Sequence, residues 1–234
     1  MLGIIGGMGP AASDLFYEMI TEKTHAHSDQ ENLDLVLISR ASMPDRTGAI
    51  LSKDPARIED VKGRLLRDAK SLEAMGCGAI AVTCNTAHYF INMIEDQVGI
   101  PFVHMIRETA KRLQDTNPGA RIAILATDGT IRTGLYQDEF EKHGIEAYTP
   151  TPSTQKLVMS EIYNYIKGGY FANAEMWGVI ETEIREMGCD GAILACTELS
   201  VVKKELKLDD YYLDPMEVMA DRCIEIFRGK GEIK

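Results

Sequence analysis

One motif occurs twice in this chain, and its two copies align without a gap. Residues 75–86 read MGCGAIAVTCNT, and residues 187–198 read MGCDGAILACTE. The methionine, the glycine and both cysteines recur in register, so that Cys77 and Cys84 correspond to Cys189 and Cys196. The chain is therefore expected to contain two halves of similar structure.

Each copy predicts the same local structure. An apolar run of about five residues behind a glycine is typical of a buried strand in a parallel sheet. Polar residues after the second cysteine are typical of a helix N-terminus. Cys84 and Cys196 are thus each expected where a strand ends and a helix begins, which is where open α/β sheets place their functional residues. Two copies predict two thiols that face each other.

The rest of the chain alternates between strand and helix patterns in the same way, which favours parallel sheets with helices on both faces. We expect an α/β fold of two similar Rossmann-like or flavodoxin-like domains related by a pseudo-twofold axis. Residues 1–98 plus 212–234 are assigned to the first domain, because the last helix follows the completed second half and is placed back on the first. Residues 99–211 are assigned to the second domain.

Apolar periodicity gives the expected elements. Strands are expected at residues 2–5, 35–39, 79–83, 101–103, 122–126 and 146–148, and in the apolar run that ends at Cys196. Helices are expected after the glycine turn 6–10, at 57–75, 86–97 and 105–115, up to residue 143, and at 172–187, 198–206 and 215–229. Residues 40–55 are expected to form a long loop of the kind that often carries function.

Composition excludes several classes of partner and location. The formal net charge of −11 argues against nucleic acid and anionic membranes as partners. No apolar run approaches the roughly 18–20 residues of a membrane span, and the first residues lack the basic segment of a signal peptide. Five cysteines without a dense spacing pattern fit the reducing cytoplasm better than a disulfide framework.

Two opposed thiols have a specific chemistry. A helix N-terminus lowers the pKa of a thiol, because its free N–H groups and its dipole favour the thiolate. One thiolate can then remove a proton from a substrate while the other thiol delivers one to the opposite face, which inverts a stereocentre without a cofactor. Cys77, Cys189 and Cys223 are instead expected to fill space in the core. The cysteine spacings do not match a structural zinc site, and no metal is expected.

Three stretches carry a resemblance to a known family. GGMGP at 6–10, CNTAH at 84–88 and ACTE at 195–198 resemble the signature stretches of the aspartate/glutamate racemases, in order and over nearly the whole chain. The resemblance implies a cofactor-independent, two-base racemase acting on a small anionic amino acid. It also implies an active site in the cleft between two similar α/β domains, and a homodimer.

The resemblance assigns roles to individual residues. Cys84 and Cys196 match the catalytic pair, and because both are present we expect catalysis in both directions. The remaining matches are residues around the substrate: Met8, Arg46, Asn85, Thr86, Lys156 and Thr197. Arg46 and Lys156 are also favoured by physics, because a closed cleft needs cations to offset the desolvation of two substrate carboxylates.

Four further residues stay open at this point. Thr127 and Thr130 lie in a turn that mirrors the first glycine turn, where their hydroxyls either contact substrate or cap the next helix. His88 and His104 either tune a thiol or only pack in the protein, and packing is the commoner case.

Several other functions compete with this interpretation. Related thiol enzymes racemise hydantoins, isomerise maleate or decarboxylate arylmalonates, and a broad-specificity amino-acid racemase is a further alternative. Residues 7–12 fit the G-x-G-x-x-G/A pattern of dinucleotide sites, but Ser39 and Arg40 stand where that site needs an acidic residue. A non-catalytic amino-acid sensor on the same cleft would bind its ligand without either cysteine.

Overall fold

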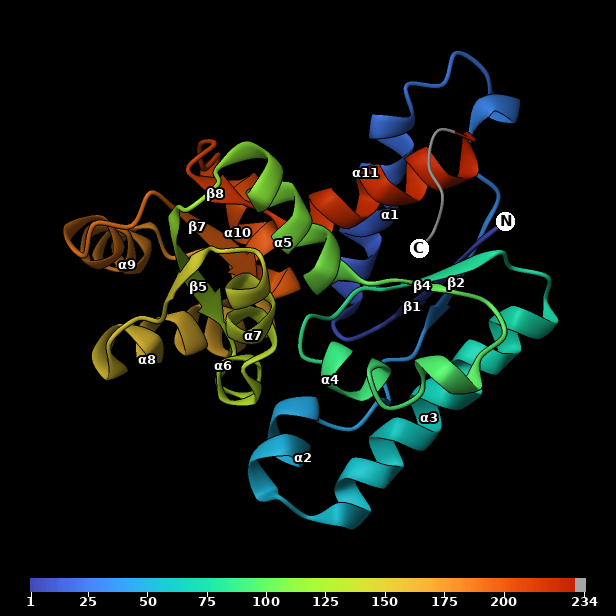
Figure 1. Cartoon of the computed structure of the whole chain (residues 1–234), viewed down its shortest axis with the longest axis horizontal. Helices are drawn as coiled ribbons and strands as arrows, with labels where there is room; N and C mark the ends of the chain where they lie inside the picture. Colours follow the sequence, from blue (N-terminus) through green and yellow to red (C-terminus); the bar gives the residue numbers. More distant parts are fainter. Residues whose placement is uncertain (230–234) are drawn as a thin grey trace.

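The structure is a computed structural model that describes residues 1–229; residues 230–234, which the domain assignment places in the first domain, lie outside the described residues. Two parallel sheets of four strands form its centre (Figure 1). The strand orders are β2-β1-β3-β4 and β6-β5-β7-β8, so the second sheet repeats the topology of the first. The predicted α/β fold with two similar halves is confirmed. The strands are β1 (Leu2–Gly6), β2 (Leu35–Ser39), β3 (Ala79–Val82), β4 (Phe102–Val103), β5 (Arg121–Ala126), β6 (Glu146–Tyr148), β7 (Gly191–Ala195) and β8 (Tyr212–Leu213).

The register of the strands explains where ligands can bind. β1 pairs in parallel with β2 on one side and with β3 on the other. β5 pairs in the same way with β6 and β7. After β2 the chain crosses to the other side of β1 to form β3, and after β6 it crosses to the other side of β5 to form β7. The strand order therefore changes direction between β1 and β3 and between β5 and β7. Open sheets bind ligands just beyond the carboxyl ends of such neighbouring strands.

Helices cover both faces of each sheet, as the β-α alternation predicts. The helices are α1 (Pro10–Thr24), α2 (Arg46–Ser52), α3 (Pro55–Ala74), α4 (His88–Ile91), α5 (Met105–Thr116), α6 (Asp128–Thr133), α7 (Leu135–Lys142), α8 (Pro152–Ser160), α9 (Ala174–Glu186), α10 (Thr197–Leu206) and α11 (Pro215–Phe227). Two single turns of 3-10 helix, η1 (Asp29–Glu31) and η2 (Glu95–Gln97), and a π-helix, η3 (Glu161–Ile166), complete the described elements.

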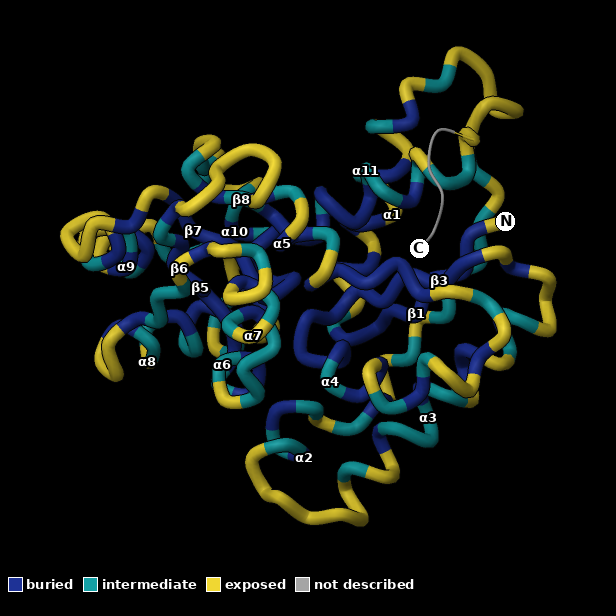
Figure 2. Tube along the Cα trace, in the orientation of Figure 1, coloured by how far each residue is buried: buried dark blue, intermediate teal, exposed yellow. Residues whose placement is uncertain are grey.

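Alternating side chains of each strand pack on opposite helical layers. In the first sheet Leu2 and Ile4 contact α1 and α11, whereas Ile5 lies in the cluster formed with α3 and α4. In the second sheet Ile124 packs with α5 and α7, whereas Leu125 packs with α8, η3, α9 and α10. The central strands β1, β3, β5 and β7 are accordingly almost wholly buried, whereas the outer strands β2 and β6 are partly exposed (Figure 2).

Helix α11 lies beside α1 and α5 (Figure 1). Its residues Met216, Met219 and Cys223 are buried in the cluster that contains Leu2 and Phe16 of the first half. Helix α5 contributes side chains both to this cluster and to the core of the second sheet. Because α5 and α11 pack between the two halves, the packing alone does not mark where one domain ends and the other begins. The domain boundaries near residues 98 and 212 therefore stay a prediction.

Three local predictions are wrong. The loop expected at 40–55 contains α2, which begins after Asp45 because that side chain accepts the Gly48 backbone N–H at 3.0 Å. The helix expected at 86–97 is reduced to α4 and η2. The helix expected to run to residue 143 is divided into α6 and α7 at Gly134, whose φ of 71° is left-handed and is favoured by glycine.

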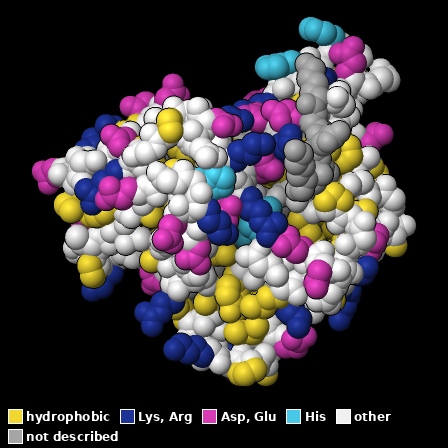
Figure 3. Space-filling model, viewed as in Figure 1, with side chains coloured by type: hydrophobic (Ala, Val, Ile, Leu, Met, Phe, Trp, Pro, Cys, Tyr) yellow, Lys and Arg dark blue, Asp and Glu magenta, His cyan; other side chains and the backbone are white. Residues whose placement is uncertain are grey.

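The surface charges and the state of the cysteines agree with what the amino-acid composition predicts. Among the described residues no helix is both long and apolar enough to cross a membrane. Acidic and basic side chains are interspersed over the face shown in Figure 3. All five cysteines are unpaired thiols. Cys77, Cys189 and Cys223 are buried in apolar clusters, as expected for residues that fill the core.

Candidate active site

The two cysteines of the repeated motif lie on the walls of one small cavity. Cys84 follows β3, and Cys196 follows β7 as the N-cap residue of α10. Each is 6% exposed. The parallel strands thus bring both thiols from their separate sheets to a shared space. We call this space the thiol chamber; its walls are Met8, Asp45, Arg46, Thr47, Cys84, Asn85, Thr86, Thr127, Tyr163, Lys167, Cys196, Thr197 and Glu198.

A larger cavity lies directly outside the thiol chamber. This outer cavity has a volume of about 550 Å³. The two spaces share part of their walls, namely Met8, Asp45, Arg46, Tyr163, Lys167 and Glu198. The thiol chamber itself measures about 10 Å³, roughly the space of one water molecule. A substrate can therefore reach both thiols only after the shared side chains move.

Arg46 is the first residue of α2 and projects toward Cys84. Its guanidinium donates to the backbone oxygens of Met43, Pro44 and Met8 at 3.3, 2.9 and 3.2 Å. Burial lowers the pKa of Arg46, but the nearby Cys84 sulfur favours the charged form, and the net pKa is raised. Its Nε is buried without a hydrogen-bond partner among the described residues. The site therefore holds a permanent cation beside Cys84 with a donor left over for a ligand.

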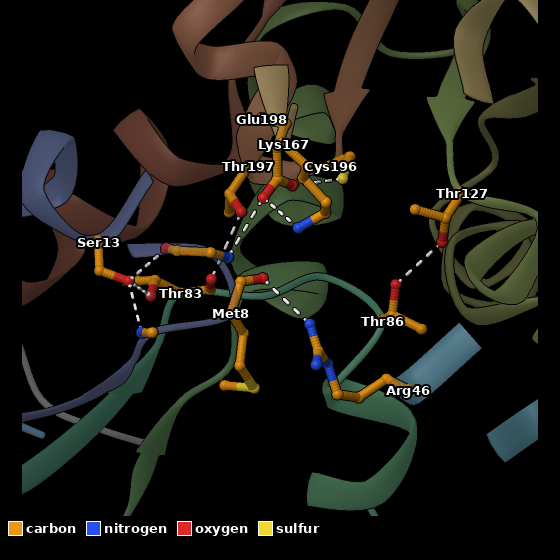
Figure 4. Close-up of polar contacts among 12 residues, drawn as sticks. Met8, Ser13, Arg46, Thr83, Thr86, Thr127, Lys167, Cys196, Thr197 and Glu198 are labelled. Atoms are coloured by element: carbon orange, nitrogen blue, oxygen red, sulfur yellow. Dashed lines mark hydrogen bonds and ion pairs between the residues drawn. The ribbon is translucent and has the colours of Figure 1, made fainter. Parts of the chain in front are cut away.

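Cys196 has a different environment, which Figure 4 shows. Its thiol donates to Glu198 Oε2 at 3.0 Å. Glu198 Oε1 forms an ion pair with Lys167 and accepts the Gly9 backbone N–H at 3.2 Å. Burial, followed by the charge of Glu198, raises the pKa of Cys196 well above its ordinary value. Cys196 is thus held as a protonated thiol.

Lys167 follows the π-helix η3 and reaches into both cavities. Its ammonium lies 5.8 Å from the ring centroid of Tyr163, within the range of a cation–π contact. Burial lowers the pKa of Lys167, but Glu198 and the Cys196 sulfur outweigh that effect, and the net pKa is raised. Lys167 is therefore a second permanent cation, next to the second thiol.

A cluster of threonine hydroxyls joins the two halves next to the thiols. Thr86 Oγ1 lies 3.0 Å from Thr127 Oγ1 and 2.8 Å from Thr130 Oγ1. Thr47 on α2 donates to Thr127 Oγ1 at 3.3 Å. Thr127 is also the N-cap of α6, because its hydroxyl accepts the Thr130 backbone N–H at 3.3 Å. Thr127 therefore caps a helix and also lines the thiol chamber, whereas Thr130 does not line it. Contact of either hydroxyl with substrate stays a prediction.

Asn85 and Thr197 follow the two cysteines. The Asn85 amide oxygen accepts the Tyr136 hydroxyl at 2.5 Å, while its Nδ2 is buried without a partner among the described residues. Thr197 donates to the Thr83 backbone oxygen at 3.4 Å. Because Asn85 also lines the thiol chamber, its amide N–H₂ is an unused donor inside that chamber.

His88 and His104 lie behind Cys84. His88 Nδ1 is 2.9 Å from the Cys84 backbone oxygen, and its Nε2 accepts the Met105 backbone N–H at 3.2 Å. Burial lowers the pKa of His88 to about 4 and that of His104 to about 2, so both rings are neutral near pH 7. Neither ring lines the thiol chamber. His88 thus supports the backbone at Cys84, and His104 packs edge-to-face against the His88 ring with the ring centroids 4.7 Å apart.

The structure does not bring Lys156 to the thiols. Lys156 lies within α8, is exposed, and lines a separate groove with Asp128 and Gln155. Sequence reasoning missed Lys167, Glu198 and the other wall residues Asp45, Thr47 and Tyr163. Glu198 lies inside the quoted motif ACTE, so position alone could have singled it out. Lys167 has no comparable signal, because only the π-helix turns it toward the thiols.

Neither a metal site nor a dinucleotide site is indicated by the residues described. Within residues 1–229, no three His, Cys, Asp or Glu side chains are grouped closely enough to hold a metal ion. The glycine turn after β1 lines the outer cavity, but two of its N–H groups are already used within the protein. The Ser13 hydroxyl accepts the Gly7 N–H and donates to the Gly9 oxygen, both at 2.9 Å, and Glu198 accepts the Gly9 N–H.

Known proteins are similar to this chain in sequence and in fold. A family model described as Asp/Glu/Hydantoin racemase matches residues 5–223. The broad specificity amino-acid racemase RacX of Bacillus subtilis (strain 168) is 24% identical, covering 97% of this chain and 98% of its own length. The structure of Picrophilus torridus aspartate racemase is 28% identical with a TM-score of 0.79, covering 100% of this chain and 96% of that one. An aspartate racemase homologue from Pyrococcus horikoshii OT3 is 25% identical with a TM-score of 0.77, covering 96% and 97%. The resemblance noted in the sequence is confirmed, and the chain belongs to the Asp/Glu/hydantoin racemase family.

Proposed function

We propose that this chain racemises aspartate, glutamate or both, without a cofactor, by a two-base mechanism at Cys84 and Cys196. The observation that carries the proposal is the meeting of these two thiols, one from each sheet, in one buried chamber. Each thiol has a cation nearby: Arg46 beside Cys84 and Lys167 beside Cys196. A thiolate on one side removes the Cα proton, and a thiol on the other side protonates the resulting carbanion from the opposite face.

The donors around the chamber supply what a dicarboxylic amino acid requires. Burying two carboxylates is costly unless they receive charge-assisted hydrogen bonds. Arg46 and Lys167 offer the charges, and the free Asn85 amide N–H₂ offers a further donor. The first backbone N–H groups of α10, at Thr197 and Glu198, suit a carboxylate because a helix N-terminus attracts anions. As the carbanion forms, negative charge spreads onto the α-carboxylate, and these donors stabilise it.

The substrate class follows from the two cations and from the relatives. The structurally similar protein of Picrophilus torridus is an aspartate racemase. A second cation, beyond the one needed for the α-carboxylate, fits a side-chain carboxylate. Broad amino-acid racemisation is the second candidate. The outer cavity of about 550 Å³, with Met43 and Ile166 among its walls, would accept longer or apolar side chains, and RacX carries that activity in its name.

The experiment is solvent deuterium incorporation at Cα of L-aspartate and L-glutamate, with chiral chromatography of the products and no added cofactor. Wild type should exchange Cα hydrogen and form the D-enantiomer. Cys84→Ala and Cys196→Ala should each abolish racemisation. Cys189→Ala is the matched control, because Cys189 is the core thiol of the same repeat, is buried in the second half and does not line the thiol chamber. Absence of exchange in wild type, or unchanged racemisation in either chamber variant, would contradict the proposal.

Two further properties belong to the same proposal. We propose a homodimer in the cytoplasm, in keeping with the resemblance and with five free thiols. Sedimentation velocity at several protein concentrations measures the first property, and a single monomer-sized species at all of them would contradict it. Fractionation of the source cells measures the second.

A further inference from the structure

Glu198 joins the second thiol to its neighbouring cation. One carboxylate oxygen accepts the Cys196 S–H at 3.0 Å, and the other pairs with Lys167 (Figure 4). Glu198 is 3% exposed, so water provides little stabilisation of its charge. The Gly9 N–H, at 3.2 Å, is the further donor to the carboxylate. The Lys167 ammonium is therefore the cation that offsets the burial of this carboxylate.

Cys196 cannot act as a base in this arrangement until it loses its own proton. Its S–H is engaged with Glu198, and burial together with the adjacent carboxylate raises its pKa. The proton needs an acceptor within the chamber. Glu198 Oε2 is already hydrogen-bonded to it, so the acceptor is in position before any substrate arrives.

Lys167 is the side chain that substrate entry must disturb. It lines both the outer cavity and the thiol chamber, and the chamber holds no more than about one water molecule in this structure. A substrate carboxylate that enters from the outer cavity meets the Lys167 ammonium at the wall between the two spaces. A new ion pair with the substrate weakens the pair with Glu198, and a buried carboxylate that loses its cation binds a proton more readily.

We propose that Glu198 takes the thiol proton of Cys196 when a substrate carboxylate draws Lys167 away, and that it returns this proton when Cys196 acts as an acid. This inference rests on the proposed two-thiol racemisation. Substrate binding thereby converts Cys196 from a thiol into a base, and without substrate the pair with Lys167 keeps Cys196 protonated.

The proton count closes over one turnover. The Cys196 S–H bond breaks and an O–H bond forms on Glu198, leaving a thiolate and a neutral carboxylic acid. The thiolate then takes the Cα proton and becomes a thiol, and the carbanion takes the proton of the Cys84 thiol. The product form of the enzyme has a Cys84 thiolate and a protonated Glu198, and exchange with water restores the first form. The opposite enantiomer uses the same steps in reverse, with the Cys84 thiolate as the base.

The surroundings of the two thiols suit the two forms of the enzyme, one with the negative charge on Glu198 and one with it on Cys84. The Arg46 guanidinium lies beside Cys84, so a cation is in place next to that sulfur. Among residues 1–229, no carboxylate is hydrogen-bonded to Cys84, whereas Cys196 is hydrogen-bonded to one. The mobile proton therefore alternates between Glu198 and Cys84, and each of these anions has its own cation.

The test compares Glu198→Gln with Glu198→Asp. Racemisation of aspartate is measured by chiral chromatography, and the pH dependence of Cys196 alkylation by iodoacetamide is measured in ligand-free protein by peptide mass spectrometry. In Glu198→Gln we expect alkylation of Cys196 to begin at lower pH, because the repulsion of the thiolate by the carboxylate is gone. Racemisation should nevertheless fall by about 100-fold or more, as expected when a proton acceptor is lost. Glu198→Asp keeps a carboxylate and should stay within about tenfold of wild type.

The two readouts separate the possible failures. A role of Glu198 in charge balance alone predicts that the more acidic thiol of Glu198→Gln retains or gains racemase activity, and that result would overturn the proposal. Glu198→Asp as inactive as Glu198→Gln, with an intact thermal transition, would also overturn it. Glu217→Gln, which removes the partner of Lys203 far from the thiols, controls for the substitution type and should match wild type in both readouts.

Alkylation also distinguishes this proposal from the function on which it rests. If wild type leaves the Cα hydrogen of aspartate in place, the proposed function fails. The shift in Cys196 alkylation between wild type and Glu198→Gln still tests the link between thiol and carboxylate, and an unchanged pH profile would overturn that link independently.

Discussion

The His88 ring is hydrogen-bonded through Nδ1 to the backbone oxygen of Cys84, at 2.9 Å, and not to the Cys84 sulfur. The other ring nitrogen accepts the Met105 N–H, so the proton must be on Nδ1 and the ring donates it to the Cys84 oxygen. A neutral, fixed histidine therefore supports the backbone just after β3 from behind. This relationship makes His88 a determinant of stability at acid pH.

We predict that acid destabilises this protein through His88. Burial lowers the pKa of His88 to about 4, against about 6.5 in an unfolded chain. The folded state has its full stability above about pH 6.5 and loses stability as the pH falls toward 4. Over this range His88 binds a proton in the unfolded chain but stays neutral in the folded one. The full effect is about 3 kcal/mol in the free energy of unfolding. Urea unfolding at pH 7.5 and 4.5 should show a smaller acid loss in His88→Gln than in wild type.

His27 and Asp214 supply the controls for this prediction. His27 is exposed, so His27→Gln should keep the acid loss of wild type. Asp214 acts in the opposite direction: burial raises its pKa to about 6, so the folded chain takes up this proton first as the pH falls and gains stability. Asp214→Asn should therefore make the acid loss steeper. An equal loss in wild type and His88→Gln would contradict the assignment.

The second prediction concerns Arg46 and Lys167, the two cations proposed to bind substrate. Lys167→Met and Arg46→Met should each lower kcat/KM for aspartate by about 10- to 100-fold, since a hydrogen bond to a charged group contributes about 1.5–3 kcal/mol. Lys156→Met should leave kcat/KM within about threefold of wild type, because its side chain is exposed and lines another groove. Steady-state kinetics decide the matter, and a larger loss for Lys156→Met than for Lys167→Met would reverse the assignment.

The third prediction concerns the hydroxyl of Thr127. Thr127→Val keeps the shape of the side chain but removes the cap of α6 and the contacts with Thr47, Thr86 and Thr130. The free energy of unfolding should fall by about 1–2 kcal/mol, as for the loss of a helix cap. Thr127→Ser keeps the hydroxyl and should lose less than half of that amount. Chemical denaturation measures both, and equal losses would mean that methyl packing matters more than the hydroxyl.

The fourth prediction concerns the contact between α2 and α6. A Cβ atom at Gly129 would lie 2.9 Å from the Thr47 Cα, so Gly129→Ala must push the two helices apart. Overpacking of this kind costs about 1–3 kcal/mol, and the shift of α2 should also lower racemase activity by moving Arg46.

Gly178→Ala is the matched control for that substitution. Gly178 lies within α9, and its added Cβ would meet nothing within 4 Å. Alanine should therefore stabilise the chain by up to about 1 kcal/mol through helix propensity alone. Thermal unfolding should shift in opposite directions for the two variants, and a shift of the same sign would contradict the steric argument.

The repeated motif predicted the sheets and the two thiols because its information is local. An apolar run behind a glycine specifies a buried strand, and Cys84 and Cys196 follow directly from the strand ends. The same reasoning could not find Lys167, whose direction depends on the π-helix η3. It also missed α2, because a seven-residue helix that includes Gly48 has weak intrinsic propensity and depends on its Asp45 cap and on packing against α6.

Lys156 shows the corresponding limit for site residues. A resemblance fixes a residue only where the surrounding motif is dense, and the region from 150 to 170 has no such motif. Lys156 and Lys167 are both lysines of the same helical segment, yet one is exposed and the other lines the thiol chamber. Only the three-dimensional path of that segment distinguishes them.

The threonine cluster determines how the two halves can move. A threonine hydroxyl can both donate and accept a hydrogen bond, and Thr86 is within reach of both Thr127 and Thr130. If one half rotated slightly against the other, a hydroxyl could therefore exchange one partner for the next and stay hydrogen-bonded. The cluster thus provides a route by which the chamber would widen for a substrate at little cost in buried hydrogen bonds.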